Sequence, residues 1–343
     1  MLQERIVPFE AGDGFQCNLI HVRGDQEPSK GPVILIHGSG VRANIFRPPV
    51  ETDFVTYLVQ NGYDVWLENW RASIDFEPNQ WTLDQGAVYD HPAAVQTVLR
   101  ETGAETLKAV VHCQGSTSFM MSVVAGLVPE VKTVVSNAVA LHPEVPAGSF
   151  FKALVAVDLL TLMTPYLNPR WGIEAPTWAA KLITLLVRLT HHECDNMVCK
   201  ISSFTYGTGR PTLWLHENLN DETHEWLKQE LAHVPLTFFK QIRKSLKADH
   251  LVPVSNLPEL PDESLHGKPK TDARFAFFAG KENVCFLPES QEKTHHFFEQ
   301  VDPGRHTLHI LPGYSHLDVF MGKNAVHDTF PLLLHELDKP SHP

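Results

Sequence analysis

The alternation of short apolar runs with helical segments constrains the fold of this chain more than any other feature. Four runs are predicted strands, namely residues 32–37 (PVILIH), 63–67 (YDVWL), 107–112 (LKAVVH) and 131–141. Helical spacing is found in residues 83–100 and 116–127, which lie between successive runs. Because parallel strands need a crossover connection, usually a helix, this alternation is typical of a mainly parallel sheet covered by helices on both faces. We therefore predict an α/β fold.

The alternation stops after residue 142 and resumes after residue 260. The intervening residues contain apolar helical stretches (FFKALVAVDLLTLM and WAAKLITLLVRL) that are interrupted by prolines. Strand, helix and strand patterns then return at 274–280, 289–300 and 306–311, followed by a last helix that ends near Leu337. We predict a core of residues 1–142 and 261–343, which begins with a hairpin at 5–23, and a helical cap of residues 143–260, because an insertion of this length is no ordinary loop.

Composition restricts the partners of such a domain. The chain has 28 Lys and Arg against 40 Asp and Glu, a net charge of −12, so it lacks the basic surface that binds nucleic acid. No apolar run approaches the ~20 residues that span a bilayer, and the first residues do not read as a secretion signal. The five cysteines are too few and too scattered for a disulfide framework. We expect a cytoplasmic protein without an integral membrane segment, whose oligomeric state the sequence does not give.

A candidate nucleophile stands where a predicted strand meets a helix, in residues 111–115 (VHCQG). A reactive side chain on such a tight turn forms a nucleophile elbow, which needs small residues two positions away on either side. Glycine meets this need on one side, and valine meets it less well on the other. We predict Cys113 as the nucleophile, with a thiol pKa lowered by the helix N-terminus. The alternatives are an ordinary buried thiol, or Ser116 or Ser118 as the nucleophile.

A histidine can reach this turn from far downstream in the chain. His316 follows the last predicted strand, in the order nucleophile, acid, histidine that suits a sheet of this kind, and we predict that it takes the thiol proton. Asn283 stands after the strand at 274–280, where a carboxylate is expected, and its side-chain oxygen can orient a histidine. Glu282 is the second choice for this role, and the alternative is that both are simple loop residues.

A glycine-rich loop (HGSG, residues 37–40) follows the first buried strand. Glycines there allow backbone N–H groups to face a developing oxyanion, and we predict the N–H groups of Ser39 and Gln114 for this role. Gly38 and Gly40 are expected beside the substrate. His112 flanks the nucleophile and is expected there or in a structural role, not as the base. A phosphate-binding loop is disfavoured because the G-x-G-x-x-G and G-K-[ST] spacings are missing.

At these residues the chain resembles the α/β-hydrolase superfamily over nearly its whole length. The stretch 62–71 (GYDVWLENWR) looks like the motif that precedes the elbow in acid-lipase-type hydrolases, and residues 194–207 look like their cap segment. The segments 280–288 and 313–318 are similar to hydrolase modules attached to cholesterol-oxidase-like flavoproteins, although this chain has no flavin-binding fingerprint. Residues 81–83 (WTL) with 112–115 (HCQG) resemble the polyhydroxyalkanoate synthases, which are acyltransferases with a Cys-His-Asp triad.

These resemblances imply an α/β-hydrolase fold and acyl chemistry, with two departures. The lipases use serine where Cys113 stands, and the synthases use aspartate where Asn283 stands. We therefore carry three hypotheses: hydrolysis of an ester, lactone or thioester through an acyl-cysteine, acyl transfer through the same intermediate, and a binding protein whose catalysis has lapsed. The expected ligand is a small acyl compound, held in an apolar pocket beneath the cap.

We expect no cofactor and no metal. His191, His192, Cys194 and Cys199 lie close together in the cap, but their spacing fits no trusted zinc pattern. A structural turn or a pair of adjacent thiols is the favoured interpretation of this cluster.

Overall fold

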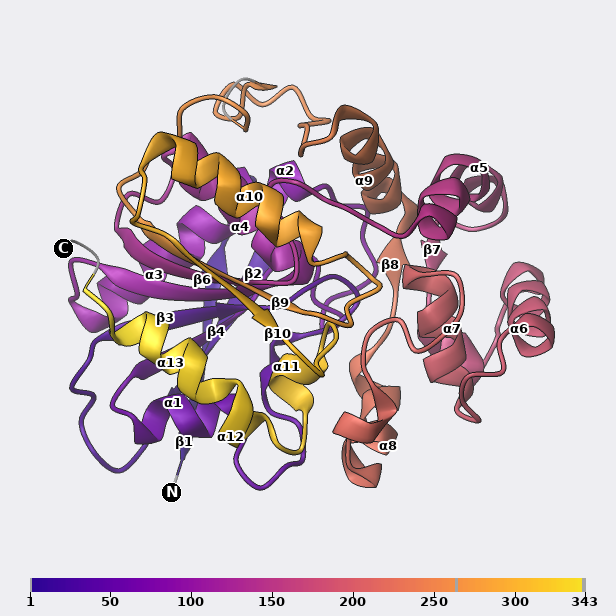
Figure 1. Ribbon diagram of the computed structural model, residues 1–343, viewed down its shortest axis with the longest axis horizontal. Helices are drawn as coiled ribbons and strands as arrows, with labels where there is room; N and C mark the ends of the chain where they lie inside the picture. Colours follow the sequence, from indigo (N-terminus) through magenta and orange to yellow (C-terminus); the bar gives the residue numbers. More distant parts are fainter. Residues whose placement is uncertain (1, 263–264, 341–343) are drawn as a thin grey trace.

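An eight-stranded sheet forms the centre of the protein, seen in a computed structural model that describes residues 2–262 and 265–340 (Figure 1). The strand order is β1-β2-β4-β3-β5-β6-β9-β10. Only the pairs β1–β2 and β2–β4 are antiparallel, and the remaining pairs are parallel. The strands are β1 (Gln3–Glu10), β2 (Gln16–Arg23), β3 (Pro32–Ile36), β4 (Asp64–Asn69), β5 (Leu107–His112), β6 (Val131–Asn137), β9 (Arg274–Gly280) and β10 (Thr307–Leu311). The predicted α/β class and the N-terminal hairpin are confirmed.

Helices cover both faces of this sheet (Figure 1). Every residue of β3, β4 and β9 is buried, which explains why these strands read as continuous apolar runs rather than as alternating patterns. The flanking elements are η1 (Ala43–Phe46), α1 (Phe54–Gln60), α2 (Leu83–Gln85), the π-helical η2 (Gly86–Asp90), α3 (His91–Thr102), α4 (Cys113–Ala125), α10 (Glu289–Val301), α11 (Asp318–Met321), α12 (Ala325–Asp328) and α13 (Phe330–Asp338). Contacts join α1 with α13, and α4 with α2 and α3.

The segment between β6 and β9 carries further helices that lie to the right of the sheet in Figure 1. We call its residues 143–260 the cap segment. It contains α5 (Ala147–Met163), β7 (Tyr166–Leu167), η3 (Pro169–Gly172), α6 (Trp178–Thr190), α7 (Met197–Tyr206), η4 (His216–Asn218), α8 (Asp221–Glu230), β8 (Val234–Pro235) and α9 (Leu236–Ala248). The two short strands pair with each other, and α5 packs on α9. Among the described residues no helix is both long and apolar enough to cross a bilayer.

Two predicted elements differ from the structure by three residues or more at one end. The strand predicted at 131–141 ends at Asn137, since Ala138 has a positive φ of 84° and turns the chain out of the sheet. The apolar residues that follow are buried without being a strand. The helix predicted at 116–127 begins three residues earlier, at Cys113, and all of its side chains are buried.

Candidate active site

Cys113 occupies the sharp turn between β5 and α4. Its φ of 54° lies in the left-handed region, which costs a residue with a Cβ about 1–3 kcal/mol. The turn packs tightly on the glycine-rich loop: a Cβ on Gly115 would lie 2.2 Å from the carbonyl oxygen of His37, and one on Gly38 would lie 2.8 Å from the Cβ of Cys113. The strained position with glycines around it is the geometry of a nucleophile elbow.

The sulfur of Cys113 is buried, and two backbone amides face it. Burial raises the pKa of the thiol to about 12, while hydrogen bonds from the backbone N–H groups of Gln114 and Ser39 oppose this rise. The prediction of a lowered thiol pKa is therefore wrong for the resting site, because the loss of solvent outweighs the field of the helix N-terminus. The two amides belong to the residues predicted for the oxyanion hole, and they converge on one point beside the nucleophile.

His316 lies in the loop between β10 and α11, close to Cys113. One ring nitrogen each of His112 and His316 and the sulfur of Cys113 all lie within 4.8 Å of one another. His316 is buried, which lowers the pKa of its imidazole to about 3, and its Nε2 atom has no hydrogen-bond partner among the described residues. The His112 ring is also held by Asn137, whose side-chain amide donates to Nδ1 over 2.9 Å.

Asn283 contacts His316 through its nitrogen. The Nδ2 atom lies 3.2 Å from His316 Nδ1, while Oδ1 accepts the backbone N–H groups of Cys285 (3.0 Å) and Phe286 (3.2 Å). Turning the amide over would point its NH₂ group at those two donors, so the observed orientation is fixed locally. The amide therefore donates to Nδ1, and the proton of the neutral imidazole sits on Nε2. The expectation that the oxygen of Asn283 orients His316 is not met, and the Glu282 side chain is exposed.

Asp318 organises the histidine loop, a role that the sequence did not suggest. Its carboxylate accepts the backbone N–H groups of Ser315 (2.7 Å) and Leu215 (3.1 Å) and the side-chain amide of Asn218 (2.7 Å). Burial raises its pKa to about 6. The sequence signal for it was its place two residues after His316, in the segment 313–318 that resembles known hydrolase modules. The loop that carries His316 is thus tied to the cap segment.

The rival serines are fully buried, and both are held by hydrogen bonds to neighbouring residues. The Ser116 hydroxyl lies 2.7 Å from that of Ser136. Ser118 donates to the Leu83 carbonyl and lies 3.0 Å from His91 Nε2, and His91 Nδ1 in turn lies 2.9 Å from Glu68. Ser118, His91 and Glu68 thus follow one another in the order of a catalytic triad, yet all three side chains are fully buried. The surroundings of Ser118 leave no room for a substrate, because even one Cβ atom added to Gly86 would lie 2.6 Å from the Ser118 hydroxyl oxygen.

A pocket opens directly onto Cys113. It encloses about 710 Å³ of empty space, part of it open to solvent, and Ser39 and Gln114 contribute to its wall beside the sulfur. The remaining wall is mainly apolar and comes largely from α5 and α9, including Val157, Leu160, Leu236, Phe238, Phe239 and Ile242. Lys152 is the only charged residue among the described residues that line the pocket. Its ammonium group donates to the Gly207 carbonyl over 2.7 Å, and burial lowers its pKa to about 7.

The other residues predicted to face the substrate occupy different positions. Gly38, His112 and His316 line a small cavity that adjoins Cys113 on a second side. Gly40 packs against α7, since a Cβ there would lie 2.3 Å from the hydroxyl oxygen of Tyr206.

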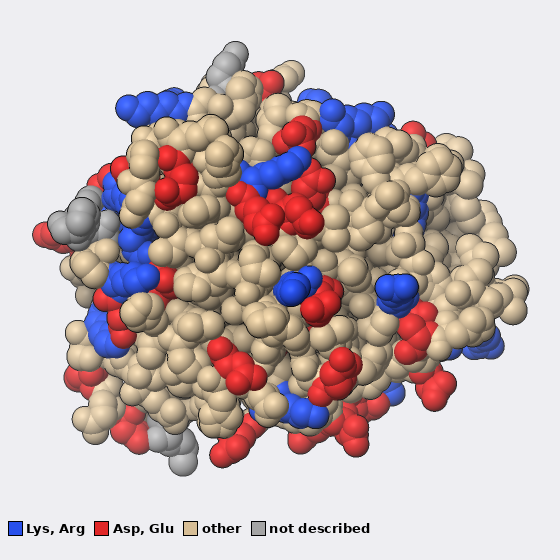
Figure 2. Space-filling model, in the orientation of Figure 1, with Lys and Arg blue, Asp and Glu red and all other residues tan. Residues whose placement is uncertain are grey.

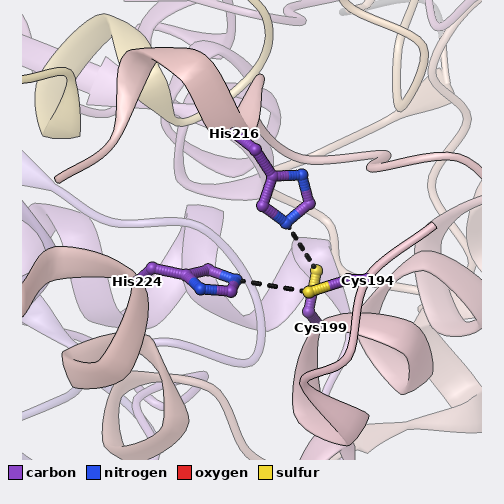
Figure 3. A group of neighbouring side chains, drawn as sticks. All are labelled: Cys194, Cys199, His216 and His224. Carbon is purple, nitrogen blue, oxygen red and sulfur yellow. Dashed lines mark hydrogen bonds between the residues drawn. The ribbon is translucent and has the colours of Figure 1, made fainter. Parts of the chain in front are cut away.

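A second group of sulfur and nitrogen atoms lies in the cap segment (Figure 3). Cys194 and Cys199 are joined there by His216 and His224, and the four candidate ligand atoms lie within 4.8 Å of one another. The neighbouring His191, which the sequence grouped with these cysteines, instead pairs its Nδ1 with the hydroxyl of Thr190.

Comparison with known proteins supports the fold and suggests a class of reaction. No protein-family profile matches the chain. Over 173 residues it is 30% identical to sterol esterase 2 of Saccharomyces cerevisiae, covering 44% of this chain and 32% of that protein. Over 193 residues it is 28% identical to lipase member K of Mus musculus, covering 51% and 48% respectively. The chain thus spans a third to a half of the length of these relatives.

Solved structures resemble the chain over nearly its full length. A soluble variant of monoglyceride lipase from Saccharomyces cerevisiae in complex with a substrate analogue superimposes with a TM-score of 0.57, at 16% identity, over 96% of this chain and 94% of that one. A monoacylglycerol lipase from Paleococcus ferrophilus gives a TM-score of 0.55, at 13% identity, over 98% of both chains. With the strand order above, these likenesses show that the chain has the α/β-hydrolase fold.

Proposed function

We propose that this α/β-hydrolase-fold chain hydrolyses carboxylic esters with an apolar acyl group, using Cys113 as the nucleophile. The observation that carries the proposal is the convergence at Cys113: a side chain held at positive φ, two backbone N–H groups facing its sulfur, and His316 in reach. Acyl transfer chemistry needs these three parts, namely a nucleophile, an oxyanion site and a proton carrier. The relatives named above, an esterase and lipases, make the same reaction class the first choice.

In this mechanism the sulfur attacks the carbonyl carbon of the ester, and the amides of Ser39 and Gln114 hold the oxyanion. His316 takes the thiol proton at Nε2 and passes it to the leaving alcohol. Water, deprotonated by the same nitrogen, then releases the acid from the acyl-cysteine. Nε2 can accept a proton only in the tautomer that carries its hydrogen on Nδ1. Because Asn283 donates to Nδ1, this tautomer is disfavoured, and we expect slow turnover.

The pocket and the outer surface of the cap segment support a lipid-like substrate. While one side of α5 lines the pocket, its other side exposes apolar side chains, and so does one face of α6. These exposed residues are Phe151, Val155, Leu159, Leu162, Trp178, Leu182, Leu185, Leu186 and Leu189. Figure 2 shows few charged side chains at the right of the molecule, where Figure 1 places the two helices. A long acyl chain fits such a pocket better than a polar substrate does.

A second candidate function is binding of the same ligands without turnover. It is favoured by the Asn283 amide, because the nitrogen of this amide, and not its oxygen, faces His316 Nδ1. Asn283 therefore offers no hydrogen-bond acceptor that would stabilise a protonated His316. Acyl transfer would use the same acyl-cysteine, but the named relatives give it no support.

The test is intact-mass spectrometry after incubation with p-nitrophenyl esters of increasing chain length. We expect an acyl adduct on the wild-type chain that peptide mapping assigns to Cys113, together with released free acid. Cys113→Ala should form no adduct, whereas Cys17→Ala, which removes another buried thiol in β2, should form it normally. Ligand binding without an adduct or free acid would favour the second function, and products that retain the acyl group on an added alcohol would favour transfer.

A further inference from the structure

Two cysteines and two histidines from four positions in the cap segment meet at one point (Figure 3). Cys194 precedes α7, Cys199 lies in its first turn, His216 begins η4, and His224 lies in α8. Each sulfur lies 3.6 Å from one imidazole nitrogen, in the pairs Cys194–His224 and Cys199–His216. Both histidines present Nε2, and their rings meet edge to face at 4.9 Å between centroids.

The two sulfur–nitrogen distances of 3.6 Å match an edge of a metal-centred tetrahedron. Zinc binds sulfur at about 2.3 Å and imidazole nitrogen at about 2.0–2.1 Å, so tetrahedral angles separate the two kinds of ligand by about 3.6 Å. A single thiol–imidazole contact at that distance could be a long hydrogen bond. Here two such contacts lie next to each other, and all four candidate ligand atoms lie within 4.8 Å of one another. The backbone N–H of Asn196 also donates to the Cys194 sulfur over 3.3 Å, a contact that favours the thiolate.

We propose that Cys194, Cys199, His216 and His224 bind one zinc ion as a closed structural site. Two thiolates and two imidazoles form a soft, tetrahedral ligand set that suits zinc better than magnesium or calcium, which prefer oxygen. All four positions are filled by the protein, so no place is left for a catalytic water. This replaces our expectation of adjacent thiols without a metal, which took no account of His216 and His224.

The zinc site connects both sides of the active-site pocket. On one side, α7 continues from Cys199 to Tyr206, whose hydroxyl donates to the Ser39 carbonyl over 3.0 Å. On the other side, the stretch that holds His216 accepts the Leu317 N–H at the Leu213 carbonyl and contacts Asp318. The metal would therefore hold the loop of Ser39 and the loop of His316 at a fixed separation. This role is independent of whether Cys113 acts as a nucleophile.

The experiment measures metal content on the full chain after purification without chelators or added metal. We expect about one zinc per chain by inductively coupled plasma mass spectrometry, in line with a single four-ligand site. Cys199→Ser and His224→Ala should lose it. Cys17→Ser and His192→Ala are matched controls for a buried thiol and a neighbouring histidine, and both should retain zinc. Cys113→Ala should also retain it, which separates this site from the His112–Cys113–His316 group.

Cobalt binding keeps the proposal testable where a ligand variant fails to fold. Zinc-stripped wild-type chain titrated with Co²⁺ should develop thiolate-to-cobalt charge-transfer absorption and the intense visible bands of a tetrahedral site, both abolished by added Zn²⁺. The melting temperature should fall on stripping and recover with Zn²⁺. Purified chain without zinc that binds no Co²⁺, a disulfide between Cys194 and Cys199 in peptide maps, or unchanged zinc content in both ligand variants would each overturn the proposal.

Discussion

Replacing Asn283 by aspartate should raise the rate at which an ester acylates Cys113. In the wild type, the only amide oxygen accepts two backbone N–H groups and the nitrogen donates to His316 Nδ1. Aspartate has two acceptor oxygens. One can retain the bonds from Cys285 and Phe286, and the other can accept a proton from Nδ1. The proton of the neutral imidazole then moves from Nε2 to Nδ1, and Nε2 becomes free to take the thiol proton.

The expected increase in the acylation rate can be worked out from the hydrogen bonds that the wild type must break to reach the tautomer with its proton on Nδ1. Turning the Asn283 amide over leaves the N–H groups of Cys285 and Phe286 facing an NH₂ group. Each unpaired buried donor costs about 1–3 kcal/mol, so the pair costs about 2–6 kcal/mol. Since about 1.36 kcal/mol changes a rate tenfold, Asn283→Asp should raise the acylation rate roughly 30-fold to 10⁴-fold.

Single-turnover acylation by a p-nitrophenyl ester measures this rate directly. Glu282→Gln is the matched control, because it alters the adjacent exposed carboxylate, and its rate should equal that of the wild type. The double variant Asn283→Asp with Cys113→Ala should release no burst of nitrophenol. An Asn283→Asp chain that folds, melts like the wild type and acylates no faster would refute the assigned tautomer and, with it, the account of slow turnover.

Three further outcomes follow from the charges around the pocket. Because burial raises the pKa of Cys113 to about 12 and lowers that of His316 to about 3, both groups keep one protonation state between about pH 6 and pH 10, so the wild-type acylation rate should be nearly constant there; a rate that climbs tenfold per pH unit would show that free thiolate attacks without His316 as the base. Burial lowers the pKa of Lys152 to about 7, so its charge is lost above that pH; KM for a neutral long-chain ester should fall as pH rises through 7, and Lys152→Met should abolish this dependence. Asp318→Asn places an NH₂ group among N–H donors, so unfolding should become about 1–3 kcal/mol easier in denaturant titrations and acylation slower, whereas equal stability would argue against the role of Asp318 as an anchor.

Much of the fold could be predicted because the central strands are buried on both faces and the crossover helices separate them cleanly. The same topology explains why Cys113, Asn283 and His316 could be placed together: each follows the C-terminal end of a parallel strand, and these ends share one edge of the sheet. The overlong strand at 131–141 shows the limit of this reasoning. Residues 138–141 are apolar because they are buried, and an apolar run reports burial rather than backbone conformation.

The parts of the site that could not be predicted depend on contacts between distant segments. His216 and His224 are two of 20 histidines, and nothing in their local sequence indicates that a turn of the cap segment brings them to Cys194 and Cys199. The anchoring of Asp318 by Leu215 is of the same kind. Burial likewise determines the thiol pKa of Cys113, and a helix N-terminus visible in the sequence does not reveal how much water the cap segment removes.

Asn283 shows how local turn chemistry and catalytic chemistry compete for one side chain. Its Oδ1 bonds to the N–H groups two and three residues ahead, the usual way in which asparagine stabilises a turn. An amide has a single acceptor atom, so an asparagine that holds this turn has only its donor left for His316. A carboxylate can do both. Order in the 283–286 turn and basicity of His316 are therefore coupled in this chain, and any change that frees the Asn283 oxygen for the imidazole must also loosen the segment that places Cys285 and Phe286 in the pocket wall.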